Sequence, residues 1–327
     1  MSSNGHGQLP VEILDARFPP LPEMARVSPP KPPSIWPALL LFFLTVLTTL
    51  SVGAEFALSY AENREPFSGN QDPFLMMLTP FEHPHLLELG VPFSFTLLVI
   101  LMAHEMGHYI ACRIYGIDAT YPYFIPAPTL FGTFGAFIRI RSPITTRRAL
   151  FDVGVAGLIV GFLIAAPAMA FAVASSKIVA GVENGADILF GDPPLVRILK
   201  AVFHPHVDPS WILLQPIGRA AWIGMFATAL NLLPCWQLDG GHILFSLEPT
   251  KHRQASLAVA LTLVGLGIYA WHGWLIWGFI LTILCLRYRH PPFYDPWESL
   301  DAKRKLIAAA AVIIFLLCFT PWPATNP

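Results

Sequence analysis

Long apolar stretches, separated by shorter polar or proline-rich segments, dominate the sequence after residue 33. A helix needs roughly 20 apolar residues to cross a hydrocarbon core of about 30 Å. About seven stretches approach or meet that length, and the sixth is the shortest. They cover residues 35–57, 89–112, 149–174, 211–233, 255–271, 274–286 and 306–319. The pattern predicts an all-α polytopic membrane protein with about seven transmembrane helices, the fifth and sixth forming a hairpin.

The segment between the second and third predicted spans, residues 116–148, has a different pattern. It contains Pro122, Pro126 and Pro128, and its residues 136–141 alternate apolar and basic side chains. Alternation with a period of two is typical of a strand, and proline disfavours a spanning helix. Irregular backbone at membrane depth must be shielded by protein or water. We therefore expect a small β-hairpin or re-entrant loop here.

The first 33 residues are polar and rich in proline, and they lack the basic start and apolar core of a signal peptide. We expect a disordered cytosolic tail in extended or polyproline II conformation. Residues 34–320 then form the predicted transmembrane domain, with polar loops at residues 59–88 and 175–210.

Composition supports the membrane assignment and excludes other classes. Of the 327 residues, 54% are hydrophobic and only 13% are charged, about half the charged fraction of soluble domains. The net charge of −1 argues against a nucleic-acid partner. The four cysteines, Cys112, Cys235, Cys285 and Cys318, are widely spaced, which indicates neither a disulfide framework nor a thiolate zinc site.

The second apolar stretch is interrupted mainly by one motif, His104-Glu105-Met106-Gly107-His108. Residues four apart lie on one face of a helix, so His104 and His108 can bind the same metal ion. Glu105 is rotated about 100° from His104, within reach of a water bound to that ion. Two histidine ligands, a general base and an open coordination position are the arrangement of zinc hydrolases. The alternative is a pair of buried histidines that bind backbone carbonyls.

A third ligand is expected from residues 231–242, which have the sequence NLLPCWQLDGGH and follow the fourth predicted span. Its aspartate, Asp239, is followed by two glycines. Glycines let the backbone turn tightly and bring the carboxylate close to a neighbouring element.

Together the two motifs resemble the site-2 protease family of intramembrane zinc metalloproteases, over roughly residues 86–247. The resemblance implies one zinc ion per chain, bound by His104, His108 and Asp239. It also implies that Glu105 is the catalytic base. The spacing from Asn231 to Asp239 is similar to that of the family.

A glycine-bearing segment adds to the resemblance. Gly132 and Gly135 are similar to a stretch in the branch of the family that lacks a PDZ domain, and the chain has no soluble insert long enough for one. We expect these glycines and Ile138, in the alternating segment, to contact substrate. The segment either forms an edge strand that pairs with an unwound substrate or merely seals the cavity. Asn231 either donates a hydrogen bond to the substrate or the oxyanion, or serves helix packing.

Basic residues give an independent prediction of orientation. They lie between spans two and three, four and five, and six and seven: Arg139, Arg141, Arg147, Arg148, Lys251, Arg253, Arg287, Arg289, Lys303, Arg304 and Lys305. The positive-inside rule places these loops and the amino terminus on the cytosolic side. Spans two and four both run toward that side, so the histidines and Asp239 reach the same leaflet. We expect a multi-pass protein of the cytoplasmic (inner) membrane with its site toward the cytosol.

The expected function is hydrolysis of a peptide bond within or beside a transmembrane segment, as in regulated intramembrane proteolysis. The expected partners are a transmembrane protein substrate and the lipid bilayer. A peptidase with a downstream glutamate ligand would need an acidic helical pair that the later spans lack. An inactive membrane scaffold would not require Glu105, and a zinc-binding transporter should show an internal repeat, which the sequence lacks.

Overall fold

The computed structural model describes residues 34–66, 80–182, 188–293 and 298–325, all within one folded unit, Ser34–Pro327. The tail predicted for residues 1–33 lies outside the described residues.

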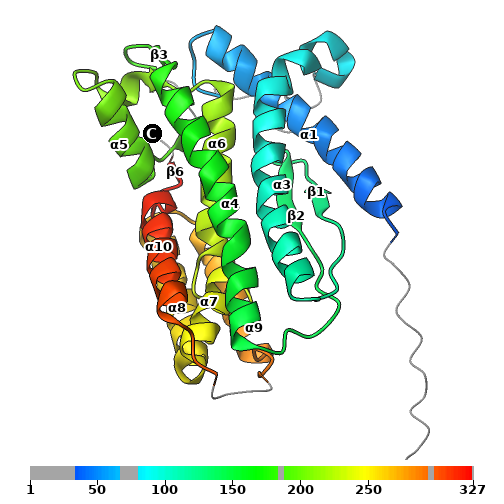
Figure 1. Ribbon diagram of the computed structural model, residues 1–327. Helices are drawn as coiled ribbons and strands as arrows, with labels where there is room; N and C mark the ends of the chain where they lie inside the picture. Colours follow the sequence, from blue (N-terminus) through cyan, green and yellow to red (C-terminus); the bar gives the residue numbers. More distant parts are fainter. Residues whose placement is uncertain (1–33, 67–79, 183–187, 294–297, 326–327) are drawn as a thin grey trace, which may run out of the picture. The chain divides into compact units, whose positions relative to one another are not determined.

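Helices occupy all seven stretches that the apolar pattern indicates (Figure 1). They are α1 (Trp36–Ala61), α3 (Val91–Ile114), α4 (Arg147–Ala174), α6 (Pro216–Asn231), α8 (Pro249–Tyr269), α9 (Gly273–Arg287) and α10 (Ala302–Cys318). Proline in the first turn begins α1, α3, α6 and α8, because it lacks the N–H that would go unbonded there and its fixed φ suits the helix.

Among the described residues, three helical segments are long and apolar enough to cross a membrane: α1, α4, and α3 together with the preceding 3-10 helix η2 (Pro84–Gly90). The helix α9 is apolar but shorter. These segments indicate a membrane protein.

The helices that carry the two motifs pack against each other. In Figure 1, α3, α4 and α6 run side by side, and the same three are in mutual contact. The short α7 (Asp239–Leu247) packs on α4, while α8 and α9 form the expected hairpin. Large side chains from α3, α4 and α6, among them Leu97, Leu158 and Met225, are completely buried between them. The end of this bundle where α3 and α6 finish is called the site end below.

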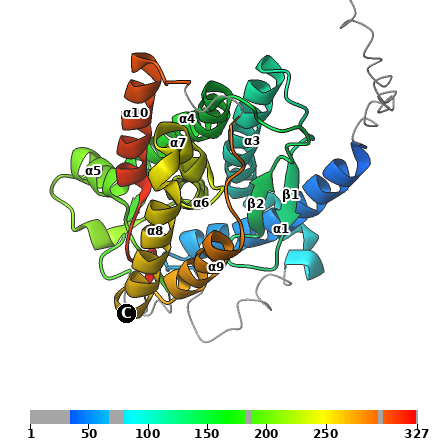
Figure 2. The same cartoon turned by 90° about the horizontal axis from the view of Figure 1, so that it is seen from below.

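A small antiparallel sheet follows α3. Strand β1 (Tyr123–Pro126) pairs with β2 (Thr133–Phe137), so that Phe124 lies opposite Ala136. Both strands lie beside α1 in Figure 2, and the Phe124 ring packs edge-on against Phe42 of α1.

Strand β2 begins three residues before the predicted segment 136–141, and beyond it only an isolated bridge joins Ala119 to Ile140. The Thr133 hydroxyl donates to the Ile125 carbonyl, which extends the pairing toward the turn. At the other end, the backbone N–H of Ile138, the residue after β2, is directed at the Glu105 carboxylate.

The second half of the chain departs from prediction in three places. The expected loop at residues 175–210 contains a helix, α5 (Pro194–Phe203). The fourth predicted span begins late, because residues 209–213 form the 3-10 helix η3 (Pro209–Trp211) and strand β5 (Ile212–Leu213). A separate helix, α7, begins at Asp239. Two further strand pairs join β3 (Lys177–Ile178) to β5, and β4 (Leu189–Phe190) to β6 (Ala324–Thr325).

Candidate metal centre

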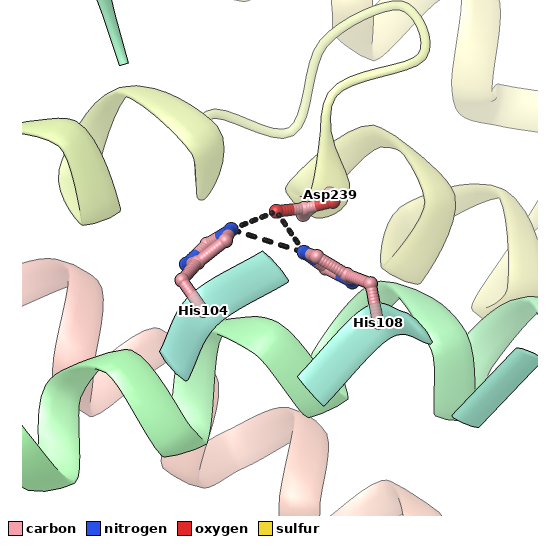
Figure 3. A group of neighbouring side chains, drawn as sticks. All are labelled: His104, His108 and Asp239. Atoms are coloured by element: carbon pink, nitrogen blue, oxygen red, sulfur yellow. Dashed lines mark hydrogen bonds and ion pairs between the residues drawn. The ribbon is translucent and has the colours of Figure 1, made fainter. Parts of the chain in front are cut away.

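Three side chains from two distant parts of the chain meet at the site end (Figure 3). His104 and His108 lie one turn apart on α3, and their Nε2 atoms are 3.0 Å apart. Oδ2 of Asp239, the first residue of α7, is 3.3 Å from each of those nitrogens. Both histidines are buried. In the part of the chain that the structure describes, this is the one group of three His, Cys, Asp or Glu residues whose ligand atoms lie close enough to hold a metal ion.

The separations fit a tetrahedral zinc ion. Ligand atoms about 2.0–2.1 Å from a central zinc lie about 3.3 Å from one another in a tetrahedron. The observed values of 3.0, 3.3 and 3.3 Å match that geometry. Three protein ligands also leave a fourth position, which is typical of a catalytic zinc.

The protonation of His108 supports the same conclusion. Its Nδ1 lies 2.7 Å from the backbone carbonyl of Val153 in α4. A carbonyl only accepts, so Nδ1 donates a proton to it, and Nε2 is the nitrogen directed at Asp239. Nε2 is therefore the His108 atom that can bind a metal ion, and the donor set of two imidazoles and one carboxylate suits zinc.

Glycines in α4 allow the histidine-bearing helix to approach closely. A Cβ on Gly157 would lie 2.2 Å from Nε2 of His108, and one on Gly161 would lie 3.2 Å from Cβ of His104. From the other side, a Cβ on Gly107 would lie 2.8 Å from the carbonyl oxygen of Ala156. Small residues thus allow close contact between α3 and α4.

Asp239 is positioned by a compact turn between α6 and α7. The glycines that follow it, Gly240 and Gly241, pack against the turn itself, where a Cβ would lie 2.1 Å and 2.4 Å from the carbonyl oxygens of Leu232 and Trp236. Only glycine fits such an approach, as the sequence indicated. The turn places the carboxylate in the first turn of α7, facing α3.

The structure also brings Glu105 and Asn231 to this group. Glu105 is buried and accepts a hydrogen bond from the backbone N–H of Ile138. Asn231 is the last residue of α6, and its Nδ2 lies 3.5 Å from Nε2 of His104. A carboxylate and an amide therefore flank the three ligands.

Gly132, just before β2, and Gly135, within it, have different surroundings. Gly132 has φ +75° and packs on α1, where its carbonyl accepts a hydrogen bond of 2.6 Å from the Thr48 hydroxyl. Gly135, within β2, has φ +100°, and a Cβ built on it meets no atom within 4 Å. Gly132 thus joins the turn to α1, whereas Gly135 borders open space along the strand.

The carbonyl of Val153 had no signal in the sequence, because every residue offers a backbone carbonyl. The motif around Asp239 predicted the carboxylate ligand, but it did not predict that Asp239 begins the helix α7.

A helix with two histidines and an adjacent glutamate, completed by a distant aspartate between buried helices, defines the class of membrane metallopeptidases. The chain belongs to peptidase family M50, whose family model matches residues 92–270, more than half of its length. The resemblance to site-2 proteases is thereby confirmed.

Several plant proteins are similar to the chain. Over 314 residues it is 28% identical to the probable zinc metalloprotease EGY1, chloroplastic, of Oryza sativa subsp. japonica, covering 91% of this chain and 52% of the relative. EGY1 of Arabidopsis thaliana is 26% identical over 90% of this chain and 55% of its own length. The probable zinc metalloprotease EGY2, chloroplastic, of Arabidopsis thaliana is 27% identical, with coverages of 76% and 44%. The chain thus spans about half the length of these relatives.

Proposed function

We propose that this protein is a zinc metalloprotease that hydrolyses a peptide bond within or beside a transmembrane segment of a membrane protein. The observation that carries the proposal is the convergence of His104, His108 and Asp239 at zinc-ligand separations, with Glu105 beside them. Membership of peptidase family M50 and the names of the relatives agree with it.

Each polar group has a role in this reaction. Bound zinc would lower the pKa of a water toward about 7 and polarise the scissile carbonyl. Glu105 accepts the proton of the attacking water and later returns it to the leaving amine. The N–H of Ile138 holds that carboxylate in place, and the Nδ2 group of Asn231 donates to the oxyanion that forms. The proton on Nδ1 of His108, fixed by Val153, keeps Nε2 available as a ligand.

An inactive scaffold or a zinc-binding transporter is the alternative. Neither would require a buried carboxylate next to the ligands, held by a backbone hydrogen bond. The position of Glu105 therefore favours hydrolysis.

We further propose that all seven helices in the apolar stretches cross the membrane, that the β1–β2 segment is re-entrant, and that the site end faces the cytosol. The basic loops, including Arg148, Arg253 and Arg289, adjoin the site end of α4, α8 and α9. The positive-inside rule supports this orientation. We propose the cytoplasmic (inner) membrane as the location.

The substrate must be unwound locally, since a helix hides its peptide bonds in hydrogen bonds. We propose that the edge of β2 that faces away from β1 pairs with the unwound stretch of the substrate, together with the residues that adjoin β2. One side of β2 pairs with β1, whereas within the described residues its other side pairs with no strand. Because Ile138 directly follows β2 and binds Glu105, this edge leads to the catalytic carboxylate.

Replacing Glu105 with glutamine tests the reaction. The probe is a single-span peptide with a fluorophore and a quencher at its ends, reconstituted with the protein in vesicles. The wild type should cleave it, whereas Glu105→Gln should bind one zinc per chain, measured by elemental analysis, and cleave at least about a hundredfold more slowly. Cleavage by the variant at the wild-type rate would exclude Glu105 as the base.

A backbone change tests whether the N–H of Ile138, which lies where the β2 edge reaches Glu105, is needed for processing. Ile138→Pro removes the N–H donor, whereas Ile138→Ala keeps it and shortens only the side chain. We expect the proline variant to retain zinc and to lose most of its cleavage, with the alanine variant close to wild type. Equal rates for the two variants would show that the backbone at this position has no part in processing.

A further inference from the structure

A cavity of about 300 Å³ lies between the first turns of α8 and the residues that follow α9. Its lining includes Arg253, Ser256, Tyr288, Arg289 and His290. It is called the basic pocket below. No role has been assigned to it in the reaction proposed above.

The basic pocket carries positive charge that none of its described lining residues balances. Arg253 and Arg289 are exposed and make no ion pair with the described residues, and no acidic residue is among the described lining residues. The nearest carboxylate in sequence, Glu248, accepts a hydrogen bond of 2.6 Å from the Thr250 hydroxyl. Burial lowers the pKa of His290 to about 4, so the arginines carry the charge at neutral pH. Such a cavity favours an anion.

The donors suit a phosphate group in particular. Guanidinium groups offer paired N–H donors that match the oxygens of phosphate, and the Tyr288 hydroxyl adds another donor. The volume is about ten times that of one water in the liquid. It therefore has room for a phosphate and a small organic group attached to it.

The neighbouring surface indicates what carries the phosphate. Ile283 and Leu286 lie on α9 within two turns of Arg289, and their side chains are 48% and 59% exposed. An acyl chain can lie along these residues while its headgroup enters the pocket. We propose that the basic pocket binds the phosphate of an anionic phospholipid, with the acyl chains along α9.

The pocket also shares a wall with the turn that positions Asp239. The backbone N–H of Trp236, another lining residue, donates to the Ser256 hydroxyl at 3.2 Å, and the Trp236 carbonyl lies 3.1 Å from Nε2 of His252. A lipid bound here therefore contacts the segment that leads to the metal centre. The binding itself does not depend on proteolysis.

Native mass spectrometry of the full chain, delipidated and then exposed to defined lipids, tests the proposal. The test variant is Arg253→Gln with Arg289→Gln. The matched control is Lys251→Gln with Arg287→Gln, which removes the same charge from exposed neighbours that do not line the pocket. The probes are dioleoyl phosphatidylglycerol, dioleoyl phosphatidylcholine and free glycerol phosphate. Unchanged zinc content and circular dichroism establish that each variant is folded.

We expect the wild type and the control variant to retain one phosphatidylglycerol, and the test variant to bind it about tenfold more weakly. Binding of phosphatidylglycerol without binding of glycerol phosphate identifies the lipid as the source. Binding of both supports a phosphate pocket that also accepts soluble compounds. Equal retention by both variants, an equal loss in the control, or retention of phosphatidylcholine as strong as that of phosphatidylglycerol would overturn the proposal.

Discussion

Two buried polar clusters lie at opposite ends of α6, and they differ in how their charges are balanced. At the site end, two imidazoles and the Asp239 carboxylate direct lone pairs at one point. At the other end, about 18 Å away by helix rise, Arg219 of α6 forms a buried ion pair with Glu65.

The second cluster extends to a neighbouring pair. Nζ of Lys200 lies 2.8 Å from the Asp192 carboxylate and also donates to the Pro209 carbonyl at 3.0 Å. The Arg219 guanidinium stacks over the ring of Phe190. Here each charge meets its opposite within the chain, whereas at the site end three potential metal ligands converge on one point. Burial of charge alone therefore does not mark a functional site; the convergence of acceptors does.

Removal of the carboxylate should break the site-end cluster. Asp239→Ala leaves two ligands, so zinc affinity should fall by more than about a hundredfold and cleavage should be lost. Equilibrium dialysis with elemental analysis measures the affinity. Asp208→Ala, which removes an exposed carboxylate from the other end, should bind zinc like the wild type. Full zinc occupancy in Asp239→Ala would contradict the ligand assignment.

The opposite cluster should respond in stability rather than in metal binding. Arg219→Ala breaks the buried ion pair with Glu65, which should cost about 3–5 kcal/mol of unfolding free energy. The double change Arg219→Leu with Glu65→Leu should recover most of that loss, because it removes both charges. Denaturant titration in detergent measures the stability, and zinc per folded chain should stay unchanged. A loss of zinc in parallel with Arg219→Ala would show that the clusters are not independent.

The smallest expected effect concerns the space around His108. Gly157→Ala places a methyl group against its ring, so zinc affinity should fall about tenfold and stability by about 1–3 kcal/mol. Gly265→Ala in α8 is the matched control, since a Cβ there meets nothing within 4 Å. That variant should be unchanged or more stable by up to about 1 kcal/mol. Equal zinc affinity and equal stability of the two variants would show that α3 can move away from α4 to make room for the methyl group.

Most of the helices and two of the metal ligands could be predicted, because the sequence contains long apolar stretches and a pair of histidines at helical spacing. Apolar length alone gives the approximate positions of seven helices, α1, α3, α4, α6, α8, α9 and α10. The i, i+4 spacing of His104 and His108 gives two ligands on one helix face. The helix α5 escaped prediction because it is short and amphipathic, with Lys200 buried through its ion pair. The start of β2 could not be predicted either, since it depends on a hydroxyl bond across the pair, from Thr133 to Ile125.

The separation of the ligands along the chain also has a consequence for biosynthesis. Asp239 follows His108 by 131 residues (239 − 108), and α4, α5 and α6 lie between them. A ribosome must therefore complete α6 and the turn after it before the three ligands can meet. Until then the nascent chain holds only two of the three ligands, so the metal centre is incomplete while the chain is being inserted. Once zinc is bound, it links the first half of the chain to the second and closes a long loop, which restricts the unfolded chain most when the loop is long. Zinc would thus stabilise the fold at a late stage of biosynthesis, in addition to its role in the reaction.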